Sequence, residues 1–337
     1  MDIKRRQLVE LHAHISASAH PSVLWSIAHA GGIKLPMKDY HQFEEHIVLS
    51  MNRKTTMREY LDSVLHPILD PLTSGTYAVE KAVHETLGGA YRSSGIDIYE
   101  LRMNPMKHNT GGQQDLDHII MAALRGMERA LLEYPQIQAG LIFCMDRQFS
   151  FRQNEIIATK AMKYRNRGVV GIDFANYEKG NFSFKEYKQL IAECKKSGLG
   201  VTVHSGETRE DNDMREAIEY LDPQRIGHGI KAAYDKKLMR ELVARKVVLE
   251  VCPMSNLVTK AVKDVAELKH ILHTFLENNV LFTINTDWPE TVEHAHLDEQ
   301  IAFLVHEKIL TEQQIDQCLE TARAATFTKG KGIEAYL

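Results

Sequence analysis

The stretch LVELHAH at Leu8–His14 is an apolar run that ends in two histidines two positions apart. Side chains at positions i and i+2 of a strand point to the same face, so His12 and His14 can bind one metal ion. Seven further short runs follow, rich in valine, isoleucine and leucine and without strict alternation, as in parallel strands covered on both faces. These runs are Ile96–Arg102, Gln138–Cys144, Val169–Phe174, Leu199–His204, Arg225–His228, Val247–Cys252 and Leu281–Thr286.

Helical patterns fill most of the gaps between these runs. Eight strand–helix units favour an α/β fold of the (β/α)8 TIM-barrel type over a doubly wound sheet. The segment Pro21–Tyr91 is longer than one crossover needs, so we expect extra helices inserted after the first strand, over one end of the barrel. No linker or repeat divides the chain, so we expect a single domain, 1–337. The predicted helices are Glu155–Asn166, Phe184–Ser197, Asp213–Leu221, Lys236–Arg245, Asp264–Asn278 and Thr311–Thr328.

The composition is that of a globular protein and excludes several classes of function. Of the 337 residues, 41 are Lys or Arg and 45 are Asp or Glu, so the formal net charge is −4 and the basic excess of a dedicated nucleic-acid binder is missing. Hydrophobic residues make up 44%, but no run approaches the ~18 apolar residues of a membrane span. We therefore expect neither a nucleic acid nor a membrane as a partner.

Four cysteines, Cys144, Cys194, Cys252 and Cys318, lie far apart and form no C-x-x-C pair. This spacing predicts neither a thiolate zinc site nor a disulfide framework. The polar and basic start, Met1 to Arg6, is not followed by the apolar segment of a secretory signal. We expect a reducing, cytoplasmic location.

Polar residues recur at the ends of other predicted strands. HSGE at His204–Glu207 follows the fifth strand, GHG at Gly227–Gly229 the sixth and NTDWP at Asn285–Pro289 the eighth. Because the carboxyl ends of barrel strands meet at one face, these residues would converge on one pocket with His12 and His14. Each motif alone has an ordinary explanation as a buried histidine or a turn residue. Their common placement favours a functional site.

With these motifs in this order, the chain resembles the adenosine deaminase family of metal-dependent aminohydrolases. The resemblance implies a (β/α)8 barrel with one Zn²⁺ per chain. It also implies a small-molecule substrate, an amino-substituted purine or purine nucleoside, that is hydrolysed with release of ammonia. Four further stretches carry the resemblance, which covers nearly the whole chain: Tyr99–Pro105 (YELRMNP), Val170–Ala175 (VGIDFA), Arg225–Gly229 (RIGHG) and Cys252–Asn256 (CPMSN).

The resemblance also implies roles for individual residues. Glu207 would donate a proton to a ring nitrogen of the heterocycle, a task for which burial should raise its pKa. His228 and Asp287 would orient a zinc-activated water and help to take its proton. Spacing alone leaves another role open for Glu207, in the acidic first turn of a helix, since Glu210 and Asp211 follow it. The implied zinc ligands are His12, His14, His204 and Asp287.

Three residues of the presumed substrate pocket depart from the family pattern. Trp288 stands where the family has a second Asp that contacts the purine, and Asn176 stands where it has a Gly. Ser16 occupies the position of an Asp that holds the sugar in the family. Since Trp cannot accept a hydrogen bond from a ring nitrogen, we expect specificity altered from plain adenosine. Alternatively, Trp288 packs under a neighbouring loop.

Two weaker features also fit the pocket. Met57–Leu72 has the pattern of an amphipathic helix, which caps the substrate pocket in the family or is a plain surface helix. The cations Lys107, His108, Arg147 and Arg209 follow predicted strands and either meet a substrate anion or are solvated surface charges.

Two other functions remain open on the sequence alone. One is a metal-dependent amidohydrolase that acts on a different heterocycle, which the HSGE and NTDWP stretches disfavour. The other is a non-catalytic heterocycle-binding barrel, which is favoured by the departures from the family pattern at Trp288 and Asn176. A pure binding protein has no need of a metal site with a proton donor beside it, and this argues for catalysis.

Overall fold

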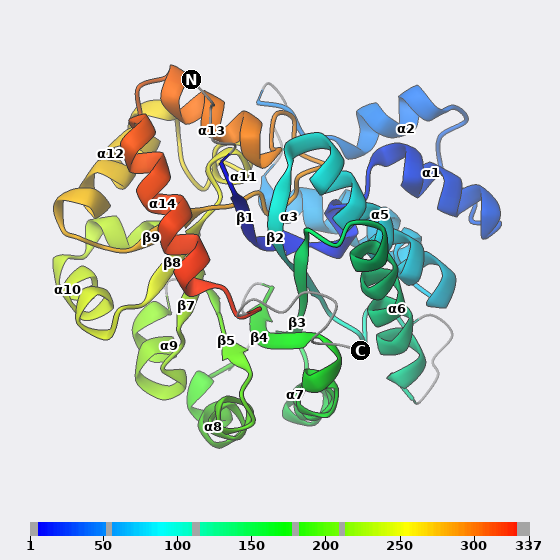
Figure 1. Ribbon diagram of the computed structural model, residues 1–337, viewed down its shortest axis with the longest axis horizontal. Helices are drawn as coiled ribbons and strands as arrows, with labels where there is room; N and C mark the ends of the chain where they lie inside the picture. The colour runs from blue at the N-terminus through cyan, green and yellow to red at the C-terminus, as the bar shows by residue number, and fades with distance from the viewer. Residues whose placement is uncertain (1–5, 52–55, 110–114, 177–181, 209–212, 329–337) are drawn as a thin grey trace.

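The computed structural model describes residues 6–51, 56–109, 115–176, 182–208 and 213–328. Its strands are all parallel and run in sequence order through a five-stranded sheet, β1 to β5, and a four-stranded sheet, β6 to β9 (Figure 1). The strands are β1 (Leu8–His14), β2 (Ile96–Met103), β3 (Gln138–Asp146), β4 (Val169–Ala175), β5 (Gly200–Val201), β6 (His204–Ser205), β7 (Arg225–His228), β8 (Val248–Val251) and β9 (Phe282–Ile284).

The first junction between the two sheets lies between β5 and β6. The chain between them stays in register with its neighbours, because Thr202 N donates to Ile172 O of β4 over 3.0 Å and Gly227 N donates to Val203 O over 2.8 Å. β5 and β6 together therefore form the single fifth strand that the sequence predicts.

The second junction joins the last strand back to the first. Asp287 N donates to His12 O over 2.7 Å, and His14 N donates to Asp287 O over 3.1 Å. The buried carboxylate of Glu10 spans the same junction, accepting from the backbone N–H of His12 at 2.7 Å and of Thr286 at 2.9 Å. Together the two junctions close eight strands into the predicted (β/α)8 barrel.

Helices surround the barrel as the sequence predicts, with small differences at their ends. α7 starts four residues earlier than predicted because Ser150 and Gln153 form a capping box. Sequence patterns did not indicate α6, α11 or α13. The helices after β2 are α6 (Asp117–Glu133), α7 (Phe151–Tyr164), α8 (Lys188–Lys196), α9 (Met214–Leu221), α10 (Lys236–Arg245), α11 (Pro253–Val258), α12 (Val265–Glu277), α13 (Leu297–His306) and α14 (Glu312–Ala325), with short helices η3 (Arg165–Arg167), η4 (Phe184–Tyr187) and η5 (Ile230–Tyr234).

The expected helical insertion lies between β1 and β2, where α1 and α2 sit at the outside of the barrel (Figure 1). Residues 57–72 form the predicted helix, whose middle part is a π-helix that contains Pro67. This wider turn suits proline, which cannot donate the backbone hydrogen bond of an α-helix. The inserted elements are η1 (Ile15–Ala17), α1 (Pro21–Ala30), α2 (Tyr40–Ile47), α3 (Met57–Tyr60), η2 (Leu61–Leu69), α4 (Asp70–Leu72) and α5 (Thr76–Ser94).

The barrel interior holds charged side chains as well as apolar ones. The fully buried Arg102 of β2 bridges Asp173 of β4 at 3.0 Å and Glu250 of β8 at 2.9 Å. Arg225 lies at the amino end of β7, and it bridges Glu250 at 2.7 Å and Glu100 at 2.6 Å. Because buried ions are costly unless paired, this network fixes how the strands face one another.

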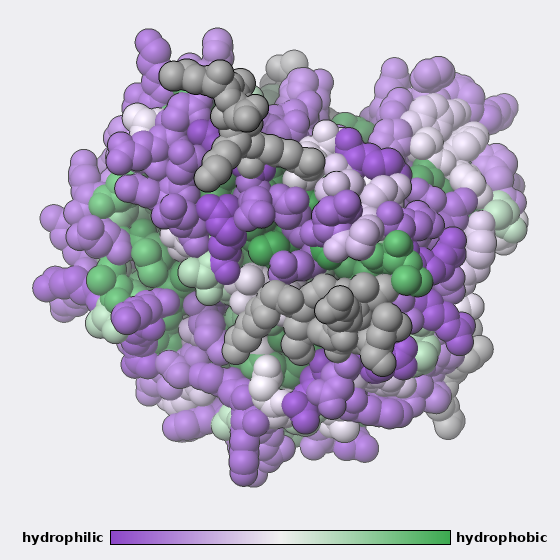
Figure 2. All heavy atoms as spheres, in the orientation of Figure 1, coloured by the Kyte–Doolittle hydropathy of each residue, from purple (hydrophilic) through white to green (hydrophobic). Residues whose placement is uncertain are grey.

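The visible face of the molecule mixes hydrophilic and hydrophobic residues (Figure 2). On the face seen in Figure 2, hydrophobic residues form separate patches among hydrophilic ones. In the described part of the chain, no helix is both long enough and apolar enough to cross a bilayer.

Candidate active site

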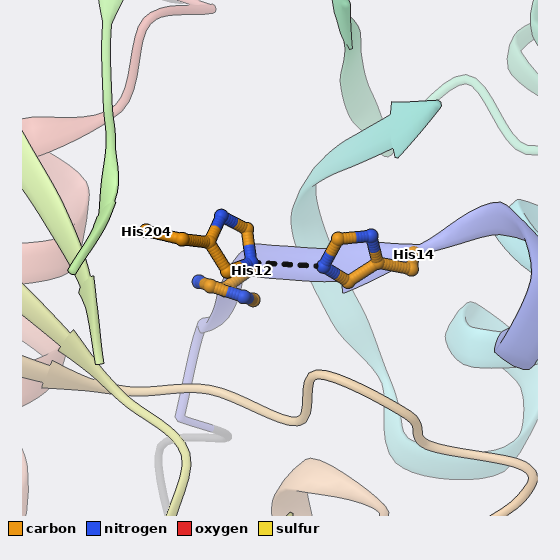
Figure 3. Close-up of side chains that lie close together, drawn as sticks. All are labelled: His12, His14 and His204. Carbon is orange, nitrogen blue, oxygen red and sulfur yellow. Dashed lines mark hydrogen bonds between the residues drawn. The ribbon is translucent and has the colours of Figure 1, made fainter. Parts of the chain in front are cut away.

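Three histidines meet at the carboxyl ends of the strands. His12 and His14 leave the same face of β1, and His204 comes from β6 on the other side of the pocket (Figure 3). His14 Nε2 lies 3.1 Å from His204 Nε2. Asp287, which follows β9, points its Oδ1 at the same space, 3.6 Å from His12 Nε2 and 3.5 Å from His14 Nε2. The structure thus brings together the four residues that the resemblance implied as zinc ligands.

Buried neighbours hold two of these imidazoles and the carboxylate in place. His12 Nδ1 lies 2.7 Å from Glu250 Oε2, and His204 Nδ1 lies 2.8 Å from Asp173 Oδ2. A carboxylate beside Nδ1 favours the tautomer with the proton on that nitrogen. The lone pair of Nε2 then points into the pocket.

Asp287 is fixed from the opposite side. Ser255 Oγ donates to its Oδ2 over 2.6 Å and leaves Oδ1 facing the histidines.

The donor set fits a zinc ion. His12 Nε2 is buried and has no hydrogen-bond partner within the described ranges, which a cation between it and Asp287 would explain. Burial and the neighbouring cationic groups hold the pKa of His12 and of His14 well below its usual value, so both rings are neutral. Burial raises the pKa of Asp287 to about 6. Three imidazoles and one carboxylate are typical of Zn²⁺ sites.

Glu207 and His228, the residues expected to transfer protons, lie close together in the same cavity. Glu207 is 8% exposed, and its Oε2 lies 3.5 Å from Nε2 of His228. Asn256 donates from Nδ2 to Glu207 Oε1 over 3.4 Å and lies 3.1 Å from His228 Nδ1. The helix α9 begins at Met214, so Glu207 is not in its first turn.

Backbone geometry at this end of the barrel is unusual. His228 and Asp287 have left-handed φ values of 58° and 65°, which few residues other than glycine adopt. Gly227 makes room for the metal site, because a Cβ there would lie 2.9 Å from Cε1 of the His12 ring. Such strain is typical of functional positions and supports the assignment of this pocket as the site.

Comparison with known proteins identifies the family. The sequence model of the family described as "Adenosine deaminase" matches residues 8–334. The chain belongs to the adenosine deaminase family. It is therefore a hydrolytic deaminase. A curated adenosine deaminase of Clostridium kluyveri is 29% identical over 332 residues, which cover 97% of this chain and 92% of that protein.

Solved structures of similar fold include two other deaminases. The adenine deaminase of Arthrobacter aurescens superposes with a TM-score of 0.79 at 23% identity, covering 95% of this chain and 93% of that chain. The N6-mAMP deaminase of arabidopsis superposes with a TM-score of 0.77 at 20% identity, with the same coverage.

Trp288 replaces a carboxylate of the family and lies in the pocket wall. It is 5% exposed, lines the cavity together with His14 and Glu207, and packs its ring against Tyr60, with 5.1 Å between ring centroids. Tyr60 begins the stretch of helix whose Leu61 and Leu65 also line the cavity. Trp288 thus lines the cavity and packs against the helical stretch 57–72 rather than under a loop, and its contact with a substrate stays a prediction. Residues 57–72 are a pocket wall rather than a plain surface helix.

Asn176 takes the place of a family glycine and keeps a glycine-like backbone, with φ of 71°. Its side chain donates from Nδ2 to Asp146 Oδ2 over 3.1 Å, and both residues line the cavity. The amide is therefore held in place at the cavity wall by Asp146.

Ser16 takes the place of a family Asp, and it contacts a different carboxylate. Its hydroxyl donates to Asp70 Oδ1 over 2.6 Å, and both residues line the cavity. Sequence reasoning missed Asp70, because only the path of residues 57–72 brings it to this wall.

Three of the four cations considered from the sequence lie at the pocket, and Arg209 falls outside the described residues. Lys107, His108 and Arg147 all line the cavity. Arg147 is buried at 3% exposure and bridges Asp213 at 3.1 Å, and Lys107 bridges Asp146 at 2.7 Å. Lys107 and Arg147 are therefore each paired with a carboxylate, and contact of these cations with a substrate anion stays a prediction.

Other functional residues were visible in the sequence only as parts of motifs. Asp173 stands in VGIDFA, and Ser255 and Asn256 stand in CPMSN, but nothing in the pattern tells which of their side chains point inward. Glu250 precedes CPMSN and gives no signal beyond being a lone acid in an apolar strand. A charge inside a predicted barrel strand is the one signal that could have found it.

Proposed function

We propose that this protein is a zinc-dependent hydrolytic deaminase of an amino-substituted purine or purine nucleoside, carried by one domain that spans 1–337. The observation that supports it best is the convergence of three Nε2 atoms and Asp287 Oδ1 beside the pair Glu207 and His228. A metal-ligand set and a proton-transfer pair in one cavity suit the hydrolysis of an aminated heterocycle.

Each of these residues has a separate role in the proposed deamination. His12, His14, His204 and Asp287 would hold the metal, which would lower the pKa of a bound water toward neutral pH. Glu207 donates a proton to the ring nitrogen next to the amino-bearing carbon and so makes that carbon electrophilic. That Glu207 has a raised pKa remains a prediction.

His228 supplies a fixed donor. Because the amide nitrogen of Asn256 faces its Nδ1, this nitrogen accepts and the ring proton lies on Nε2, directed at the pocket. Burial holds the pKa of His228 well below its usual value, so the ring is neutral and its tautomer is defined. The carboxylate of Asp287 is placed to accept the proton that the attacking water loses.

We further propose that specificity differs from that of plain adenosine deaminases. Trp288 cannot accept a hydrogen bond from a protonated ring nitrogen, and Asn176 adds a side chain at the rim of the cavity. The expected substrate is a purine whose edge is recognised by packing against Trp288 rather than by a second carboxylate.

A substrate screen tests both proposals. The metal-loaded protein is incubated with adenine, adenosine, adenosine 5′-monophosphate and their N6-substituted and ring-substituted analogues, and ammonia or amine release is measured. We expect one aminopurine to be turned over far better than adenosine. Adenosine turnover at a kcat/KM of ~10⁴ M⁻¹s⁻¹ or more contradicts altered specificity. Bound zinc with no product from any compound supports a non-catalytic binding barrel instead.

A further inference from the structure

A polar cluster of the cavity wall joins Ser16 of η1, His66 of η2 and Asp70 of α4. Asp70 accepts from Ser16 Oγ at Oδ1 over 2.6 Å and lies 2.9 Å from His66 Nδ1 through Oδ2. All three residues line the cavity. The mechanism above uses none of these three side chains, so their arrangement needs another explanation.

The carboxylate of Asp70 has hydrogen-bonding capacity left over. Two carboxylate oxygens offer about four acceptor positions, and Ser16 and His66 occupy two of them. The side chain is only 15% exposed, and its exposure is to the cavity, which the residue lines. Although burial raises the pKa of Asp70, hydrogen bonds from His66 and Ser16 and the nearby His108 leave it below its usual value, so the acceptor stays ionised.

The chemistry of this wall suits a neutral donor. A phosphate would meet the negative charge of Asp70, and the Lys and Arg side chains that line the described cavity, Arg102, Lys107 and Arg147, already face carboxylates. Lys107 bridges Asp146, and Arg147 bridges Asp213 and donates to the backbone oxygen of Asn176. A cation at Asp70 would crowd the imidazole of His66, whose Nδ1 already lies 2.9 Å from Asp70 Oδ2. Hydroxyl groups can donate to the open acceptor positions without a change in charge.

We propose that Asp70, positioned by Ser16 and His66, is a specificity-determining residue that binds hydroxyl groups of an uncharged substituent on the heterocycle. This inference rests on the proposed function and narrows its substrate class to sugar-bearing purines, nucleosides rather than nucleotides or free bases. Apolar side chains flank the subsite, since Leu61 and Leu65 of the same helical stretch line the cavity.

The test compares the variant Asp70→Asn with Asp62→Asn, an exposed carboxylate of the same helical stretch. Binding of the deaminated pair inosine and hypoxanthine, and of inosine 5′-monophosphate, is measured by calorimetry on the metal-loaded proteins. We expect wild type and Asp62→Asn to prefer inosine over hypoxanthine by at least about tenfold, the effect of one hydrogen bond to a charged acceptor. Asp70→Asn should lose most of this preference while its affinity for hypoxanthine stays the same.

Three results overturn the inference. These are an inosine preference that survives Asp70→Asn, an equal loss of affinity for both ligands in this variant, and tighter binding of inosine 5′-monophosphate than of inosine. Binding of none of the three ligands overturns it as well. Failure of the proposed function looks different, because wild type then releases no ammonia from any aminopurine, whereas failure of the subsite leaves ammonia release intact.

Discussion

Ser255 shows how this site depends on residues that do not line the cavity. Its hydroxyl holds Oδ2 of Asp287, so the other carboxylate oxygen is turned to His12 and His14. Asp173 and Glu250 do the same for His204 and His12 through their Nδ1 atoms. Partners of this kind orient a metal ligand and raise its basicity.

Replacement of Ser255 by Ala should weaken zinc binding about 10–100-fold, because Asp287 loses the donor that fixes its rotamer. Competition with a chromogenic chelator measures this affinity. Ser93→Ala, at an exposed helical serine whose hydroxyl bonds only locally, is the matched control and should bind zinc like wild type. An unchanged zinc affinity in Ser255→Ala would show that Asp287 is not a ligand.

At the residue scale, the sequence was sufficient to place a side chain in the site where its motif lies at the end of a strand. The H-x-H pair, HSGE and the aspartate of NTDWP could be placed because a strand's period and its carboxyl end decide where a side chain points. Asp70 could not be placed, since its position depends on the path of residues 57–72. Their π-helical turn and its proline shift the register in a way that the pattern does not reveal.

At the scale of elements, Phe327 closes the amino end of the barrel. Its ring lies 3.7 Å from the guanidinium of Arg225, measured to the ring centroid, and its backbone N–H donates to Glu100. Gly200 of β5 lets the ring enter, because a Cβ there would lie 2.3 Å from ring carbons of Phe327. The predicted closing helix, Thr311–Thr328, ends at Ala325 so that Phe327 can turn inward.

Gly200→Ala should lower the free energy of unfolding by about 1–3 kcal/mol, since the new methyl group forces Phe327 or the strand to shift. Urea denaturation provides the measurement. Gly89→Ala is the control: it lies in α5 with nothing within 4 Å of an added Cβ, and it should stabilise by about 0.5–1 kcal/mol. Equal stability of Gly200→Ala and wild type would mean that Phe327 does not plug the barrel.

At the scale of the molecule, eight apolar runs in sequence order were enough to predict the barrel. The break between β5 and β6 and the short β9 escaped prediction, because strand lengths depend on hydrogen bonds to neighbours rather than on the apolar pattern. The long segment after β1 was predicted as an insertion of helices. Its contribution to the pocket through Tyr60, Leu61 and Asp70 was visible only once the chain was folded.

Removal of the metal should destabilise the whole barrel, because the proposed ligands come from its first and fifth strands and the segment after its last. A ligand that binds only the folded state at about 100 times its Kd contributes ~2.7 kcal/mol. For a chain of 337 residues, chelation should therefore lower Tm by about 4 °C. Readdition of zinc, but not of magnesium, should restore it. A Tm that is identical before and after verified metal removal would argue against a site that joins the strands.

The most direct test of the account is the deaminase activity of Glu207→Gln, with zinc content measured on the same sample. Glutamine keeps the shape of the side chain but has no proton to give, so we expect full zinc occupancy with kcat on the preferred aminopurine lowered about 10²–10⁴-fold. A zinc-loaded Glu207→Gln protein that releases ammonia at nearly the wild-type rate would contradict the account.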